Sequence, residues 1–145
     1  MSTTTAPYAA APSVGATQDS LALLGRVLIA LLFVPAGFGK IAGFAGVVGY
    51  IGAVGLPLPQ LGAVIAIAVE LGLGLLLLVG YKTRIVSIIL AVFTVATAVF
   101  FHNYWAMPAD KAYINQLMFF KNIAIAGGLL AIAALGAGRF SLDKK

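Results

Sequence analysis

One apolar stretch of nineteen residues with a single carboxylate at its centre constrains this chain most. Residues 61–79 read LGAVIAIAVELGLGLLLLV, and Glu70 is the only charged residue among them. A helix of this length and apolarity can cross a bilayer. Charged side chains at that depth are costly, roughly 2.5–3.5 kcal/mol for the more polar ones on insertion scales. Glu70 is therefore expected to have a partner from another helix.

Composition places the chain among integral membrane proteins. Of its 145 residues 62% are hydrophobic and 9% are charged, and its mean hydropathy is +1.09; a soluble domain of this size needs far more polar surface. The net charge of +5 is scattered rather than gathered in a basic tract. This distribution suits anchoring to lipid headgroups and argues against a nucleic-acid partner.

Cysteine is absent from the sequence. Disulfides, thiolate nucleophiles, iron–sulfur ligation and c-type haem attachment are thereby excluded. The sequence also contains one histidine, so a zinc or haem site is not expected, and neither is a covalent cofactor. Redox chemistry on this chain would need a bound cofactor, or electrons would have to pass directly between small molecules.

Four apolar stretches predict an all-α membrane protein, a bundle of four transmembrane helices. The spans are expected at about 21–41, 61–79, 85–101 and 116–135, within one membrane domain over 21–139. Residues 1–20 are small and polar and lack the features of a signal peptide, so we expect a disordered tail. Residues 140–145 are expected to form a second tail.

The first loop, residues 42–60, combines regularly spaced glycines with apolar residues and ends near Pro57 and Pro59. We interpret it as a short helix lying in the membrane interface. The alternative is a flexible linker.

Basic residues are distributed unequally between the two sides of the predicted bundle. Six lie on the side of the termini and three on the other: Arg26, Lys82, Arg84, Arg139, Lys144 and Lys145 against Lys40, Lys111 and Lys121. The positive-inside rule then predicts that both termini are cytoplasmic.

Three interpretations of Glu70 remain open at this stage. It could form a buried ion pair with Arg26 that fixes the packing of the helices, since a guanidinium offers a fork to a carboxylate. The two could instead line one polar pocket for an anion or a quinone headgroup. In the third interpretation Glu70 is protonated, because burial penalises its charged form.

A second polar group is expected toward the outer side of the membrane. Lys40, Lys121 and His102 together would make a cationic site for an anion such as an oxidised sulfur compound. The alternative is that the lysines extend to lipid headgroups and His102 is an interfacial residue.

The order of these features resembles the DoxX family over residues 20–143. The matching features are Arg26, residues 37–40 (GFGK), 49–59 (GYIGAVGLPLP) and 68–84 (AVELGLGLLLLVGYKTR), Lys121 with Asn122, and 136–143 (GAGRFSLD). The resemblance implies a four-helix protein of the bacterial inner membrane. Related proteins form a thiosulfate:quinone oxidoreductase, and other members resemble partners of sulfurtransferase and superoxide dismutase proteins in oxidative-stress assemblies.

Two functions follow as hypotheses. In the first, the chain is a subunit of a quinone-linked oxidoreductase: Glu70 and His102 carry protons, and quinone or substrate is bound by the remaining polar residues, Arg26, Lys40, Lys121 and Asn122. In the second, it is a non-enzymatic scaffold that recruits soluble or membrane redox proteins through Lys82, Arg84 and the C-terminal tail. Transport of a small solute is a weaker third hypothesis, because four spans would need a homo-oligomer to form a path.

Overall fold

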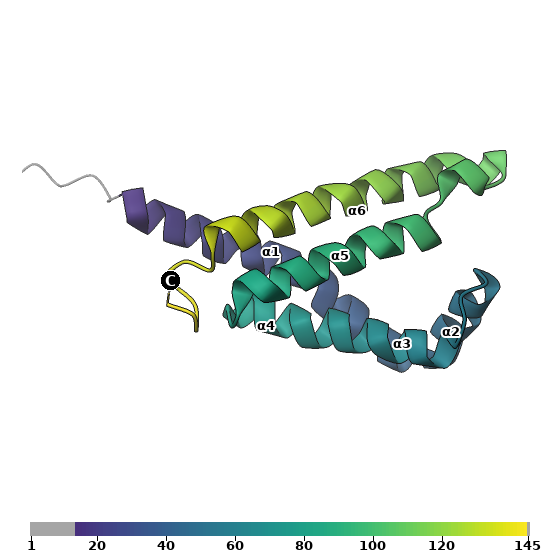
Figure 1. Ribbon diagram of the computed structural model, residues 1–145, viewed down its shortest axis with the longest axis horizontal. Coiled ribbons are helices and arrows are strands. Elements are labelled where there is room, and N and C mark those ends of the chain that lie inside the picture. The colour runs from purple at the N-terminus through teal and green to yellow at the C-terminus, as the bar shows by residue number, and fades with distance from the viewer. Residues whose placement is uncertain (1–13, 145) are drawn as a thin grey trace, which may run out of the picture.

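The computed structural model describes residues 14–144, and their regular structure is entirely helical (Figure 1). In chain order the elements are α1 (Val14–Ala42), α2 (Phe44–Ala53), α3 (Pro59–Ile67), the π-helix η1 (Ala68–Leu73), α4 (Gly74–Val79), α5 (Thr83–Phe101), the 3₁₀ turn η2 (Tyr104–Ala106) and α6 (Ala109–Leu135). Four runs are long and apolar enough to cross a membrane: Gly15–Ala42, Pro59–Val79, Thr83–Ala106 and Ala109–Leu135. The predicted four-helix class is confirmed, and so is a short helix after the first span.

Two predicted boundaries are wrong. Helix α1 already begins at Val14, so the last seven residues of the expected tail, 14–20, are helical; residues 1–13 lie outside the described part. No proline follows Pro12 until Pro35, so nothing interrupts this helix early. Helix α6 begins at Ala109 rather than near Gln116, because Pro108 stands at its N-cap and starts the helix ahead of the apolar stretch.

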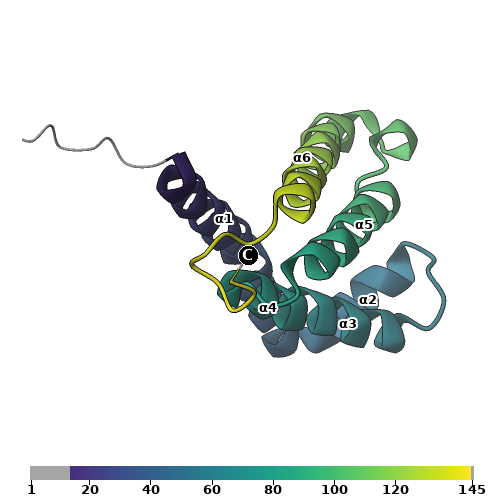
Figure 2. The same cartoon turned by 60° about the vertical axis from the view of Figure 1, so that its left-hand side comes forward.

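The helices form two arms. Helices α5 and α6 pack side by side, while α1, α2, α3, η1 and α4 make up the other arm (Figures 1 and 2). The arms join through contacts of α5 with α4 and η1, and of α6 with α1. Among the described residues α2 and α3 contact neither α5 nor α6 through their helical backbones, so the arms diverge toward the end where α2 and η2 lie.

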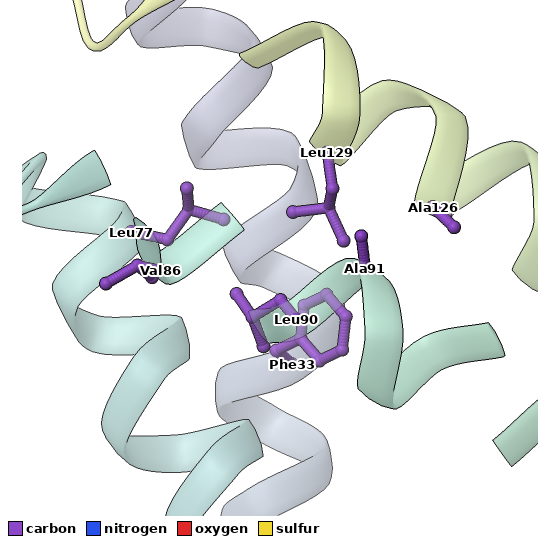
Figure 3. Close-up of a cluster of buried hydrophobic side chains, with 7 residues drawn as sticks. All are labelled: Phe33, Leu77, Val86, Leu90, Ala91, Ala126 and Leu129. Atoms are coloured by element: carbon purple, nitrogen blue, oxygen red, sulfur yellow. The ribbon is translucent and has the colours of Figure 1, made fainter. Parts of the chain in front are cut away.

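The buried apolar core lies where the arms join. Figure 3 shows its members converging from α1, α4, α5 and α6: Phe33, Leu77, Val86, Leu90, Ala91, Ala126 and Leu129. Four helices contribute to this one cluster, so it holds the two arms at their junction and leaves their far ends apart.

We call the end formed by residues 80–83 and 136–144 the closed end. Arg26 is fully buried there and donates hydrogen bonds to the carbonyl oxygens of Leu77 (3.4 Å) and Leu78 (3.0 Å), at the end of α4, and of Phe140 in the C-terminal segment. Gly80 lies directly against this group, since a Cβ atom there would come within 2.3 Å of an Arg26 nitrogen. A buried guanidinium thus supplies donors to carbonyls at the end of α4 and in the C-terminal segment.

The C-terminal segment completes the closed end. Its backbone bonds the chain at the end of α4, from Leu142 N to Val79 O (3.1 Å) and from Asp143 N to Gly80 O (2.9 Å). The Asp143 carboxylate accepts hydrogen bonds from the amides of Lys82 and Thr83, both at 2.8 Å, and so caps the start of α5. The expected C-terminal tail is therefore packed against the bundle as far as residue 144.

Candidate functional site

A cavity of about 520 Å³ lies between the arms. Most of its wall is apolar, supplied by α1, α2, α3 and α5, and includes the aromatic rings of Phe33, Phe93 and Phe100. Its polar lining comprises Lys40, Tyr50, Glu70, Thr94, Thr97, His102, Lys121 and Asn122. An apolar cavity with a few convergent polar groups is the usual form of a small-molecule site.

An ion pair forms the polar centre of this cavity. The Lys40 ammonium lies 2.6 Å from a Glu70 carboxylate oxygen, and the side chains are 28% and 11% exposed. Lys40 comes from the last turn of α1 and Glu70 from the π-helix η1. π-Helical turns inside helices occur frequently at functional sites, and here the turn carries the only charged residue of its span.

Two glycine contacts determine where Glu70 lies along the axis of α1. A Cβ atom on Gly37 would lie 2.7 Å from the Leu71 backbone nitrogen, so α1 and η1 touch here backbone to backbone. One turn further along, a Cβ atom on Gly74 would lie 3.1 Å from Phe33 and Val34 side-chain atoms. Since Lys40 follows Gly37 by three residues on the same face of α1, this contact brings its ammonium beside Glu70.

The opposite wall is supplied by α5 and α6. Asn122 is buried and donates to the hydroxyl oxygen of Thr97 at 3.5 Å, and that hydroxyl in turn donates to the Thr94 carbonyl at 2.8 Å. Lys121 has an exposed side chain whose ammonium lies 3.3 Å from the Met118 sulfur. These groups put hydrogen-bond donors across the cavity from the ion pair.

His102 lies where α5 ends. Its Nδ1 is 3.2 Å from the side-chain oxygen of Asn115 on α6, and the imidazole is part of the cavity lining.

Five of the six predicted site residues line this one cavity: Lys40, Glu70, His102, Lys121 and Asn122. Arg26 does not, and the interpretation in which Glu70 pairs with Arg26 is wrong. Arg26 precedes Gly37 by eleven residues, about 16 Å of helix rise, so the Gly37–Leu71 contact that brings Lys40 to Glu70 leaves the guanidinium at the closed end. Arg26 thus binds backbone carbonyls at the end of α4 and does not line the cavity.

Sequence reasoning missed three polar cavity residues, Tyr50, Thr94 and Thr97. Thr94 and Thr97 lie three residues apart in a mostly apolar span, and that spacing places both hydroxyls on one face of a helix. This spacing is the feature of the sequence from which the two threonines could have been predicted to face the cavity. No group of three or more His, Cys, Asp or Glu side chains that could hold a metal ion occurs among residues 14–144.

Comparison with known proteins identifies bacterial membrane relatives. A DoxX family model matches residues 21–103. The chain is 38% identical to the inner membrane protein YphA of Escherichia coli over 131 residues, which cover 90% of this chain and 94% of that protein. It is 41% identical to the inner membrane protein YqjF of Escherichia coli over 127 residues, covering 88% and 92% respectively.

A more distant similarity extends to eukaryotes. A surfeit locus protein 4 homolog of Drosophila melanogaster is 26% identical over 141 residues, which cover 94% of this chain and 46% of that protein. No solved structure matches the chain.

Proposed function

The chain belongs to the DoxX family, and from this premise we propose that its cavity binds a quinone headgroup as part of a quinone-linked oxidoreductase system of the inner membrane. The observation that carries the proposal is the Lys40–Glu70 ion pair, which faces an aromatic-walled cavity between transmembrane helices. Ionisable residues inside a membrane bundle are costly, and they commonly mark a substrate or proton pathway.

The cavity suits a quinone in size and chemistry. Its volume of about 520 Å³ falls within the range of small-molecule pockets. A quinone ring is flat and carries two carbonyl oxygens, both of them acceptors. Phe33, Phe93 and Phe100 provide apolar ring surfaces, while the Lys40 ammonium and the Asn122 amide provide donors on opposite walls.

The proposed reaction adds two electrons and two protons to the quinone, one proton to each carbonyl oxygen, to give a quinol. Glu70 and His102 are the cavity groups that we assign to proton transfer. The electrons come from a second molecule, either a redox partner protein or an anionic sulfur compound beside Lys121 and His102 at the rim of the cavity. Two thiosulfate ions, for example, release two electrons when they join through a new sulfur–sulfur bond.

Native mass spectrometry of the protein extracted with its own lipids tests the binding. Wild type is expected to carry a quinone and to retain added decylubiquinone, and Glu70→Gln is expected to lose both while still inserting into the membrane. Asp110→Asn is the matched control, because it makes the same carboxylate-to-amide change at the start of α6, outside the cavity lining. A wild type that carries only phospholipid would contradict the proposal.

The scaffold alternative depends on Lys82, Arg84 and the C-terminal tail as free contact surfaces. Arg84 and the tail have internal roles in the described structure, whereas at Lys82 only the backbone amide is engaged and the side chain is exposed. Arg84 donates to the carbonyls of Ala133 (3.1 Å) and Ala134 (2.8 Å) at the end of α6, and the Lys82 amide is bound by Asp143. These contacts favour the binding proposal over the scaffold.

A further inference from the structure

We infer that the cavity is loaded sideways from the lipid, through the gap between the arms, while a Tyr50–Phe101 bridge closes its water-facing end. The inference rests on the proposed function for the identity of the headgroup and extends it to the ligand class. The ligand is a membrane-dissolved amphiphile whose apolar chain stays between the arms.

The lateral gap follows from how the arms meet. Their contacts are those of α5 with α4 and η1 and of α6 with α1, and α1 meets α6 where Gly25 and Ile29 approach Ile132 and Gly128, toward the closed end. Beyond the level of η1 no described element of one arm contacts the other through its helical backbone, yet both arms line the cavity. The cavity therefore has sides that neighbouring helices leave open.

Apolar side chains flank these open sides. Leu32 of α1 and Phe100 of α5 both line the cavity and are 41% and 48% exposed. In a bilayer such surfaces contact acyl chains at no hydrophobic cost, whereas in water they would be unfavourable. An isoprenoid or acyl chain fits this boundary, and a small water-soluble ion does not.

The end of the cavity where α5 stops is closed differently. There Tyr50 of α2 and Phe101, the last residue of α5, stack with ring centroids 5.3 Å apart, and the Tyr50 hydroxyl donates to the Phe101 carbonyl at 3.5 Å. Both residues line the cavity. The bridge joins the two arms at the membrane boundary, where water would otherwise enter.

Helix α2, which carries Tyr50, has few buried side chains. In α2 only Ile51 is buried, and it contacts α3 at Gly62, where a Cβ atom would lie 3.4 Å from the Ile51 side chain. Helix α2 otherwise packs on α3 and α1 of its own arm and has no helical backbone contact with α5. The Tyr50–Phe101 contact is therefore what ties α2 to α5 across this end of the cavity.

A single cysteine inside the cavity tests both routes. The chain contains no cysteine, so Ala96→Cys places one thiol on the α5 wall of the cavity. In proteoliposomes it is expected to react with bilayer-dissolved pyrenylmaleimide and only slowly with the water-soluble sulfonatoethyl methanethiosulfonate. Adding Tyr50→Ala or Phe101→Ala is expected to raise the rate with the sulfonate reagent by about two- to tenfold, given the usual strength of an aromatic pair, and to leave the pyrenylmaleimide rate unchanged.

Matched variants separate gating from misfolding. Tyr104→Ala removes an aromatic residue at the same end whose ring packs 5.7 Å from Phe119 within one arm, so it should change neither rate. Val92→Cys, 66% exposed on α5 and outside the cavity lining, gives the reference rates of a thiol outside the cavity, which the alanine substitutions should leave unchanged. Tyr50→Phe keeps the ring and should stay close to wild type. The inference is overturned if the sulfonate reagent already reacts fast with Ala96→Cys alone, or if neither alanine variant changes its rate.

Decylubiquinone distinguishes this inference from the proposed function. If it protects Ala96→Cys from pyrenylmaleimide, both stand. If it gives no protection while Tyr50→Ala still admits the sulfonate reagent, the lipid route and the bridge stand and the quinone assignment fails.

Discussion

The two ends of this bundle use charged residues in opposite ways. At the closed end Arg26, Arg84 and Asp143 bind backbone groups at helix ends, so each charge completes a helix. Toward the diverging ends of the arms, Lys40, Glu70 and Lys121 face a cavity instead. A charge in an apolar span is thus structural where a helix terminus lies within reach, and available to a ligand where none does.

This contrast predicts different consequences of mutation at the two ends. Substitutions at the closed end remove partners from buried backbone carbonyls and should reduce stability. Substitutions in the cavity should reduce ligand binding, and those that leave its charges balanced should change stability little.

The largest effect is expected at Arg26. Arg26→Met would leave the carbonyls of Leu78 and Phe140 without the side-chain donor and remove one of the two donors to Leu77, which should lower the free energy of unfolding by about 2–4 kcal/mol. Unfolding of the purified protein in detergent, followed by circular dichroism, measures this.

Arg26→Lys is the comparison variant, since it keeps the charge but loses the several donors of the planar guanidinium. Its free energy of unfolding should lie between those of wild type and Arg26→Met. If Arg26→Met unfolds like wild type but loses a cavity ligand, the assignment of Arg26 to the closed end is wrong.

An intermediate effect is expected at the junction between α1 and η1. Gly37→Ala would push its methyl group into Leu71 backbone and side-chain atoms 2.7 Å away, and overpacking of this kind costs about 1–3 kcal/mol. Because the same contact brings Lys40 to Glu70, ligand binding should fall together with stability.

Gly39→Ala is the matched control two residues along the same helix. Nothing lies within 4 Å of the added Cβ atom, so the higher helix propensity of alanine should stabilise the protein by about 0.5–1 kcal/mol. Equal effects of the two substitutions on ligand binding would contradict the proposed role of the Gly37 contact.

The sequence was sufficient to predict the four spans because hydrophobic length alone identifies a transmembrane helix. It also predicted a partner for the Glu70 carboxylate, from the cost of isolating a charge there. The start of the fourth helix is less predictable, because the polar residues around Asp110 and Lys111 precede the apolar stretch, and α6 runs through them from Ala109.

Which cation meets Glu70 could not be predicted in the same way. Helix rise gives the spacing of Arg26 and Lys40 along α1, but the vertical offset between α1 and its neighbour is set by one backbone contact, Gly37 against Leu71. The π-helical turn arises at the same contact and has no periodic signal of its own. Pairwise helix packing, rather than any single helix, therefore determines the site.

The smallest effect on stability is expected when both partners of the cavity ion pair are replaced together. In Lys40→Met with Glu70→Met, two apolar side chains of similar length occupy the place of the 2.6 Å pair. Buried ion pairs are often replaced by apolar residues at no net cost, whereas removal of one partner leaves an uncompensated charge and is strongly destabilising. Unfolding in detergent should thus rank the double variant close to wild type and above Glu70→Met alone, while decylubiquinone retention is lost in both. A double variant that retains the quinone would assign the ion pair to packing, and the difference between the two ends of the bundle would then be one of position and not of function.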